Sequence, residues 1–135
     1  MSYRFGDRSI KRLEGVHENL IVCASKALYA SDFDMTIPWM GGLRTAKEQN
    51  EIFKKGYSQR DGYTRKSYHQ TGMAIDIIPV DGGYTNGAGF RHFAGKMFSQ
   101  WQSMIKNGQI PENMYLEWGG HWTSFIDKPH WQVII

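Results

Sequence analysis

Residues 67–80 read SYHQTGMAIDIIPV, a stretch in which a polar turn leads into a strongly apolar run. The run from Met73 to Val80 predicts a strand, because it is short, rich in isoleucine and bounded by turn-forming residues. Asp76 lies in the middle of this run. A buried carboxylate is destabilising unless a partner compensates its charge. We expect that partner to be a metal ion, with His69 as a second ligand.

The composition indicates one globular domain with one core. The chain has 135 residues, of which 41% are hydrophobic and 21% charged, which excludes a disordered chain. A net charge of +3 favours polyanionic surroundings, but the lack of a block of basic residues gives little support to nucleic-acid binding. Cys23 is the single cysteine and stands among apolar neighbours, so we expect it to be buried and structural.

No apolar run approaches the ~20 residues of a membrane span. The N-terminal MSYRFGDRSIKR carries charges without a following apolar stretch, so we expect no signal peptide and first residence in a cytoplasm.

The pattern of apolar residues predicts helices that alternate with short strands. Thr45 with Glu48 forms a capping-box pattern, and apolar residues recur at helical spacing from Phe90 to Ile105. The predicted helices are 7–15, 17–30, 46–56 and 90–105. The predicted strands are 35–39, 73–80, 115–118 and 129–134. This order predicts an α+β fold with a small, mostly antiparallel sheet packed with helices.

A catalytic zinc site uses three protein ligands and keeps one position open, so a further histidine is expected beside His69 and Asp76. The candidates are His17, His92, His121 and His130. A surface or capping role at the start of a helix is favoured for His17, and an exposed position for His92. The last two both lie in EWGGHWTSFIDKPHWQ, residues 117–132.

Asp127 precedes His130 by three residues. A carboxylate that close can face a metal without ligating it, which is what a general base requires. A rival interpretation pairs Asp76 with Arg44 or Arg65 in a buried ion pair and leaves the histidines without a metal.

Residues 67–76, SYHQTGMAID, resemble the S-x-H-x-x-G-x-A-x-D signature of zinc D-alanyl-D-alanine carboxypeptidases and L-alanyl-D-glutamate endopeptidases. Residues 127–131, DKPHW, resemble the acidic-x-x-His segment of that family. The stretch GLRT at 42–45, followed by Glu48 and Gln49, looks like its Arg-Thr stretch before a helix. The short length and the missing signal peptide look most like a single-domain phage endolysin.

The resemblance implies a zinc peptidase domain over residues 1–135, with a hedgehog-like fold. It implies zinc bound by His69, Asp76 and His130, with Asp127 as the catalytic base. Arg44 would bind a substrate carboxylate or stabilise the oxyanion, and Ser67 would support substrate or ligand positioning. Relatives often carry WGGDW where this chain has WGGHW at 118–122, so His121 is a cleft residue, a loop residue or a competing ligand.

The function implied by the resemblance is a zinc-dependent endolysin that hydrolyses the L-alanyl-D-glutamate bond of peptidoglycan stem peptides and lyses the cell wall. The alternatives are a D,D-carboxypeptidase that removes terminal D-Ala, and a non-catalytic metal- or wall-binding module. We expect a monomer without a nucleic-acid partner. It would stay in the host cytoplasm until a separate membrane-permeabilising protein allows its release.

Overall fold

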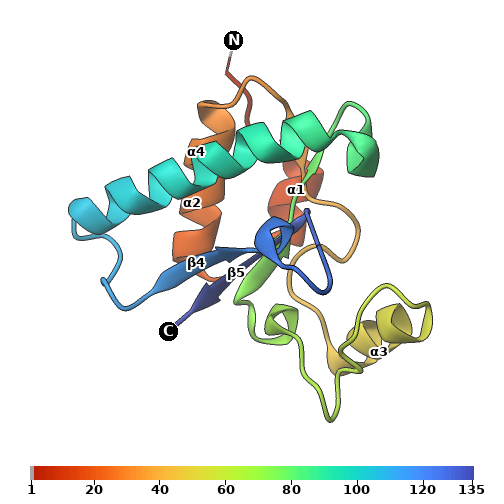
Figure 1. Cartoon of the computed structure of the whole chain (residues 1–135). Helices are drawn as coiled ribbons and strands as arrows, with labels where there is room; N and C mark the ends of the chain where they lie inside the picture. The colour runs from red at the N-terminus through yellow and green to blue at the C-terminus, as the bar shows by residue number, and fades with distance from the viewer. Residues whose placement is uncertain (1) are drawn as a thin grey trace.

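The computed structural model describes residues 2–135 and combines helices with short strands (Figure 1). The helices are α1 (Asp7–Arg12), α2 (Glu18–Tyr29), α3 (Ala46–Lys54) and α4 (Gly87–Lys106). The strands are β1 (Met35–Thr36), β2 (Ala74–Asp76), β3 (Ile78–Pro79), β4 (Tyr115–Trp118) and β5 (His130–Ile134). Three short 3-10 turns are η1 (Tyr68–Thr71), η2 (Gly83–Thr85) and η3 (Gly119–His121). The predicted α+β class is confirmed.

All strand pairs are antiparallel, as predicted. One sheet has the order β2-β5-β4, and β1 pairs with β3 in a second sheet of two strands. In the larger sheet, Asp76 at the end of β2 lies opposite His130 at the start of β5. The register of this sheet therefore brings two of the predicted ligands together from distant parts of the chain.

The prediction of one continuous strand over residues 73–80 is wrong. The Ile77 amide still donates to the carbonyl of Pro129, next to β5, at 2.9 Å. The chain changes partner after Ile77, so β2 joins one sheet and β3 the other. Ile75 and Ile77 before the break are buried, and so is Pro79 after it. Because the two halves are equally apolar, the hydrophobic pattern carries no sign of the change.

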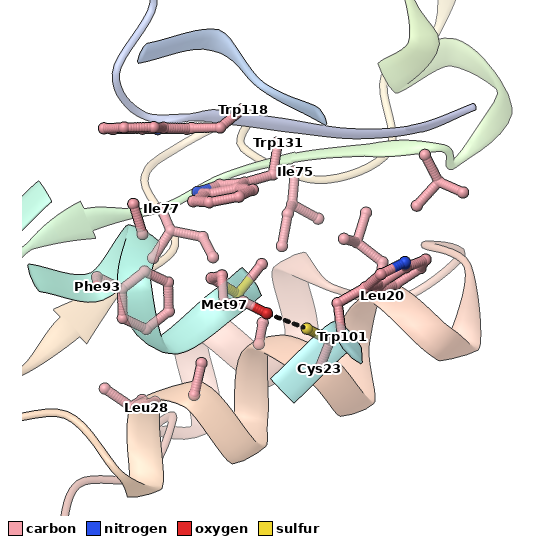
Figure 2. Packing of buried hydrophobic residues seen from close by; sticks show 14 of the residues in the cluster. Leu20, Cys23, Leu28, Ile75, Ile77, Phe93, Met97, Trp101, Trp118 and Trp131 are labelled. Carbon is pink, nitrogen blue, oxygen red and sulfur yellow. Dashed lines mark hydrogen bonds between the residues drawn. The ribbon is translucent and has the colours of Figure 1, made fainter. Parts of the chain in front are cut away.

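The main core lies between the larger sheet and the helices α2 and α4 (Figure 2). Trp118 and Trp131 stack at its sheet side, with ring centroids 5.6 Å apart. Cys23 donates a hydrogen bond from Sγ to the carbonyl oxygen of Met97 at 3.4 Å. Cys23 is buried, as predicted, and burial raises the pKa of its thiol to about 12.

Helix α3 lies to one side, away from α2 and α4 (Figure 1). It begins with the predicted capping box, in which the Thr45 hydroxyl accepts from the Glu48 amide and the Glu48 carboxylate accepts from the Thr45 amide. The Gln49 side chain donates to the Ser58 hydroxyl and to the Arg60 carbonyl, so α3 fixes the loop that follows it. Among the helices of residues 2–135, none combines the length and apolar character that a membrane crossing requires.

Candidate metal centre

Three side chains predicted as ligands meet where η1, β2 and β5 come together. Nε2 of His69 lies 3.2 Å from Nδ1 of His130. Oδ1 of Asp76 lies 3.3 Å from the first of these nitrogens and 3.4 Å from the second. Within residues 2–135, this is the one group of three or more histidine, cysteine or acidic side chains arranged to hold a metal ion.

His69 is held by the turn in which it lies. Ser67 caps this turn by accepting from the His69 amide at 3.2 Å. The turn ends at Gly72 with a positive φ of 75°, and a Cβ there would lie 2.3 Å from the carbonyl oxygen of Gly15. Nδ1 of His69 donates to the Gly42 carbonyl at 2.9 Å, because a carbonyl only accepts. Nε2 therefore keeps its lone pair and points at the cluster.

The two oxygens of Asp76 have different surroundings. Oδ2 accepts from Nη2 of Arg44 at 3.0 Å, so the ion pair of the rival interpretation is present. Oδ1 is buried without a hydrogen-bond donor from residues 2–135. Burial acts to raise the pKa of Asp76, but without a metal the positive charge of the adjacent His69 and His130 rings, in their protonated form, holds it well below its usual value. The arrangement therefore leaves one anionic oxygen free to bind a cation.

A metal ion fits this donor set. The cluster brings together an orphaned carboxylate oxygen and a histidine nitrogen whose lone pair is free, with a second histidine nitrogen at a similar distance from both. When both rings are neutral and turn their lone pairs towards Asp76, these three atoms repel one another unless a cation lies between them.

Arg44 is almost fully buried, and its guanidinium is anchored on three sides. Nε donates to the Met40 carbonyl at 2.7 Å, Nη1 to the Gln49 side chain at 3.0 Å, and Nη2 to Asp76. The residue also lines the cleft over the cluster. These bonds position the Asp76 carboxylate, while the contact of Arg44 with substrate stays a prediction.

The cluster lies in a cleft of about 860 Å³. Ser67, Asp127 and Trp122 line this cleft together with the three clustered side chains. Trp118 and Trp131 belong to the core instead. Trp39 lines the cleft as well, so Trp39 and Trp122 are the tryptophans placed to touch a bound molecule.

Asp127 is half-buried in this cleft and has a perturbed pKa. Burial and the negative charge of Asp76 raise the pKa of Asp127 to about 6. The backbone of Asp127 is held against η3, because its amide donates to the Gly119 carbonyl at 2.9 Å. A Cβ at Gly119 would lie 2.3 Å from the Asp127 carbonyl oxygen, so this close approach requires glycine.

The other histidines lie outside the cluster. The His121 ring stacks on Phe98 at 5.6 Å and meets Trp118 edge-on at 4.9 Å, which makes it an exposed packing residue near the sheet. His17 caps α2, as predicted. His92, predicted to be exposed, is half-buried against Phe33 and accepts a backbone hydrogen bond from the loop after α2.

The comparisons with known proteins agree with this geometry. The profile of the phage L-alanyl-D-glutamate peptidase family matches residues 1–131. The chain belongs to this family. It is similar to the L-alanyl-D-glutamate peptidase of Listeria phage A118, with 28% identity over 98% of this chain and 43% of that relative. It is also similar to the peptidoglycan L-alanyl-D-glutamate endopeptidase CwlK of Bacillus subtilis, with 34% identity over 69% of this chain and 58% of that relative.

A solved structure of another protein has the same fold. The L-Ala D-Glu endopeptidase ChiX of Serratia marcescens superposes with a TM-score of 0.78 and 27% identity, covering 98% of this chain and 91% of ChiX. The chain spans about half the length of the curated relatives it matches.

Two partners of the ligand histidines were missed by the sequence analysis. One is the Gly42 carbonyl behind His69, which leaves no signal in the sequence because any residue supplies a carbonyl. The other is Gln132, whose Oε1 lies 2.8 Å from Nε2 of His130. Alternation along a strand places residues i and i+2 on one face, so Gln132 was open to prediction.

Proposed function

We propose that this chain is a zinc-dependent peptidase that hydrolyses the L-alanyl-D-glutamate bond of peptidoglycan stem peptides, as an endolysin does. The observation that carries the proposal is the triangle formed by His69, Asp76 and His130, with Asp127 in the same cleft. Family membership and the printed names of the relatives favour this bond over the terminal D-Ala bond of the carboxypeptidase alternative.

The dimensions of the triangle support zinc as the metal. In a tetrahedral zinc site with bonds of about 2.0–2.1 Å, neighbouring ligand atoms are about 3.3–3.4 Å apart. The three separations here are 3.2, 3.3 and 3.4 Å. Three protein ligands leave a fourth position open, as in catalytic rather than structural zinc sites.

The proposed mechanism divides the chemistry between two carboxylates. Bound zinc would supply a Lewis acid that makes water nucleophilic near neutral pH. Asp127 accepts a proton from the water that attacks the alanyl carbonyl carbon. It then returns this proton to the amine nitrogen of D-glutamate as the C–N bond breaks. Asp76 stays anionic, held by Arg44, and the remaining N–H groups of that guanidinium are the ones available to a substrate oxygen.

The charge distribution in the cleft supports an anionic peptide as substrate. Glu117 and Asp127 line the cleft together with Asp76 of the cluster, and Lys55 and Arg60 line the same cleft. Neither cation forms an ion pair within residues 2–135. A D-glutamyl residue presents a carboxylate that such cations attract. We include Ser67 among the residues that contact this substrate.

The remaining proposals concern the setting in which the chain acts. Residues 1–135 would form one zinc peptidase domain, which is supported by the single apolar core that joins α2, α4 and the larger sheet. The domain would act as a monomer on the stem peptide. It would remain in the host cytoplasm until a separate membrane-permeabilising protein gives it access to the wall.

Mass spectrometry of purified muropeptides tests the proposed function. The protein, incubated with zinc, should release fragments that end in L-Ala, and a zinc chelator should stop this release. Release of D-Ala alone would instead support the carboxypeptidase alternative. Intact muropeptides in the presence of bound zinc would support the binding-module alternative.

A further inference from the structure

A chain of hydrogen bonds extends from His130 away from the metal cluster. Nε2 of His130 lies 2.8 Å from Oε1 of Gln132. The Gln132 amide nitrogen donates to Oε1 of Glu117 at 3.0 Å, and the indole nitrogen of Trp122 donates to the same oxygen at 2.9 Å. Gln132 and Glu117 are register partners on β5 and β4, so the sheet itself holds them together.

The chemistry of these groups allows only one direction for this series of hydrogen bonds. A carboxylate only accepts hydrogen bonds, so Gln132 must present its NH₂ group to Glu117. The amide carbonyl of Gln132 must then face His130. A carbonyl also only accepts, so the proton of the neutral His130 ring lies on Nε2. Nδ1, which faces His69 and Asp76, is left with a free lone pair.

Glu117 is unusual for a half-buried carboxylate. No cation pairs with it within residues 2–135, and its two partners are the neutral N–H groups of Gln132 and Trp122. A role in sheet stability alone does not require a charge at this position, because an amide would pair across the strands equally well. A carboxylate is required if the partner amide has to be held in one orientation.

We infer that Glu117 and Gln132 are positioning residues that fix the tautomer of His130, so that Nδ1 is presented to the metal. This inference rests on the proposed metal site. The two ligand histidines are then controlled differently, because the tautomer of His69 is set by the backbone carbonyl of Gly42 and that of His130 by side chains. Only the tautomer of His130 can therefore be changed by substitution of a side chain that holds it.

The test compares variants of Gln132 and Glu117 by two measurements that do not depend on peptidase activity. The first is the dissociation constant for zinc, obtained by competition with a chromophoric chelator. The second is the tautomer of His130 in the metal-free protein, read from long-range ¹H–¹⁵N correlations at the alkaline end of a titration, where the ring is neutral. Circular dichroism of the metal-free variants confirms that they fold.

Gln132→Met removes the acceptor at nearly constant length. We expect it to weaken zinc binding about 10–100-fold and to produce a mixture of His130 tautomers. Glu117→Met leaves the Gln132 amide free to turn, so we expect a smaller loss in the same direction, and this variant carries the test if Gln132→Met does not fold. Glu112→Gln removes one exposed negative charge elsewhere and is the matched control, with both readouts unchanged.

The double variant Glu117→Gln/Gln132→Glu exchanges the carboxylate and the amide between the two positions. It tests whether the direction of the hydrogen bonds determines the tautomer of His130. The new carboxylate at position 132 would accept from His130 and from the new amide at position 117, whose carbonyl still accepts from Trp122. We expect this variant to regain the single tautomer and most of the zinc affinity that Gln132→Met loses.

A folded Gln132→Met protein with the wild-type tautomer and wild-type zinc affinity would overturn the inference. So would a double variant as impaired as Gln132→Met. Failure of the proposed function gives a different result, because a wild-type protein that binds zinc but leaves muropeptides intact keeps the two readouts of this test measurable.

Discussion

Asp76 and Asp127 are two carboxylates in one cleft whose surroundings move their pKa values apart. The pKa of Asp76 is held well below its usual value despite burial, by the adjacent His69 and His130 rings, so it remains an anion. The pKa of Asp127 is raised to about 6 by burial and by the charge of Asp76. Groups separated in this way take different roles, which fits the proposed roles of Asp76 as a metal ligand and Asp127 as a proton carrier.

The pKa of Asp127 is directly measurable in the metal-free protein. We expect the ¹³C carboxyl signal of Asp127 to titrate near pH 6, because burial disfavours its ionised form. Its basic form is the carboxylate, so the fraction able to accept a proton rises as the pH increases through this value. A midpoint near the ordinary aspartate value of about 3.9 would show that the cleft does not desolvate this group.

Substitution of Asp127 separates proton transfer from metal binding. Asp127→Asn keeps the size of the side chain but removes the base, so we expect kcat to fall by about 10²–10⁴-fold. Zinc stoichiometry, measured by atomic absorption, should stay at the wild-type value. A variant that retains wild-type turnover would exclude Asp127 as the base.

For single residues, the sequence was sufficient to predict which side chains form the cluster but not which contacts hold them in place. The signature in residues 67–76 and the segment around His130 led to the three clustered side chains, because a catalytic site tolerates few alternatives in residue type. The anchoring of Arg44 on Met40 and Gln49 depends on the folded backbone. No spacing rule gives the direction in which a guanidinium points.

Among the elements, η3 determines where Asp127 lies. The close contact between Gly119 and the Asp127 backbone leaves no room for a side chain. We expect Gly119→Ala to displace Asp127 and lower kcat, while zinc affinity is preserved because the three clustered residues lie on other elements.

Gly95→Ala is the matched control for this substitution. A Cβ at Gly95 would meet no atom within 4 Å, on the exposed side of α4. We expect unchanged kcat and a gain of up to about 1 kcal/mol in the free energy of unfolding, as helix propensity predicts. Equal kcat in both variants would contradict the role given to η3.

The boundaries of the helices were largely predictable because caps and apolar periodicity are local signals. The division between β2 and β3 was not, since a change of strand partner is decided by tertiary contacts. That division is important for the site: it ends β2 at Asp76, where the ligand carboxylate faces His69 and His130 instead of continuing into the sheet.

For the whole molecule, zinc would connect segments from the middle and the end of the chain. Binding to the folded state alone adds about 2.7 kcal/mol of stability when free zinc is 100 times its dissociation constant. We therefore expect zinc to raise the Tm by several degrees in differential scanning calorimetry. His69→Ala should remove this increase, and an equal increase in that variant would show that the ion binds elsewhere.

Anomalous diffraction from crystals of the zinc-loaded protein, at the zinc absorption edge, tests the central claim most directly. We predict one strong peak bonded to Nε2 of His69, Oδ1 of Asp76 and Nδ1 of His130, with the fourth position facing the cleft. A peak at other residues, or a fourth protein ligand that closes the site, would contradict the proposal of a catalytic zinc centre.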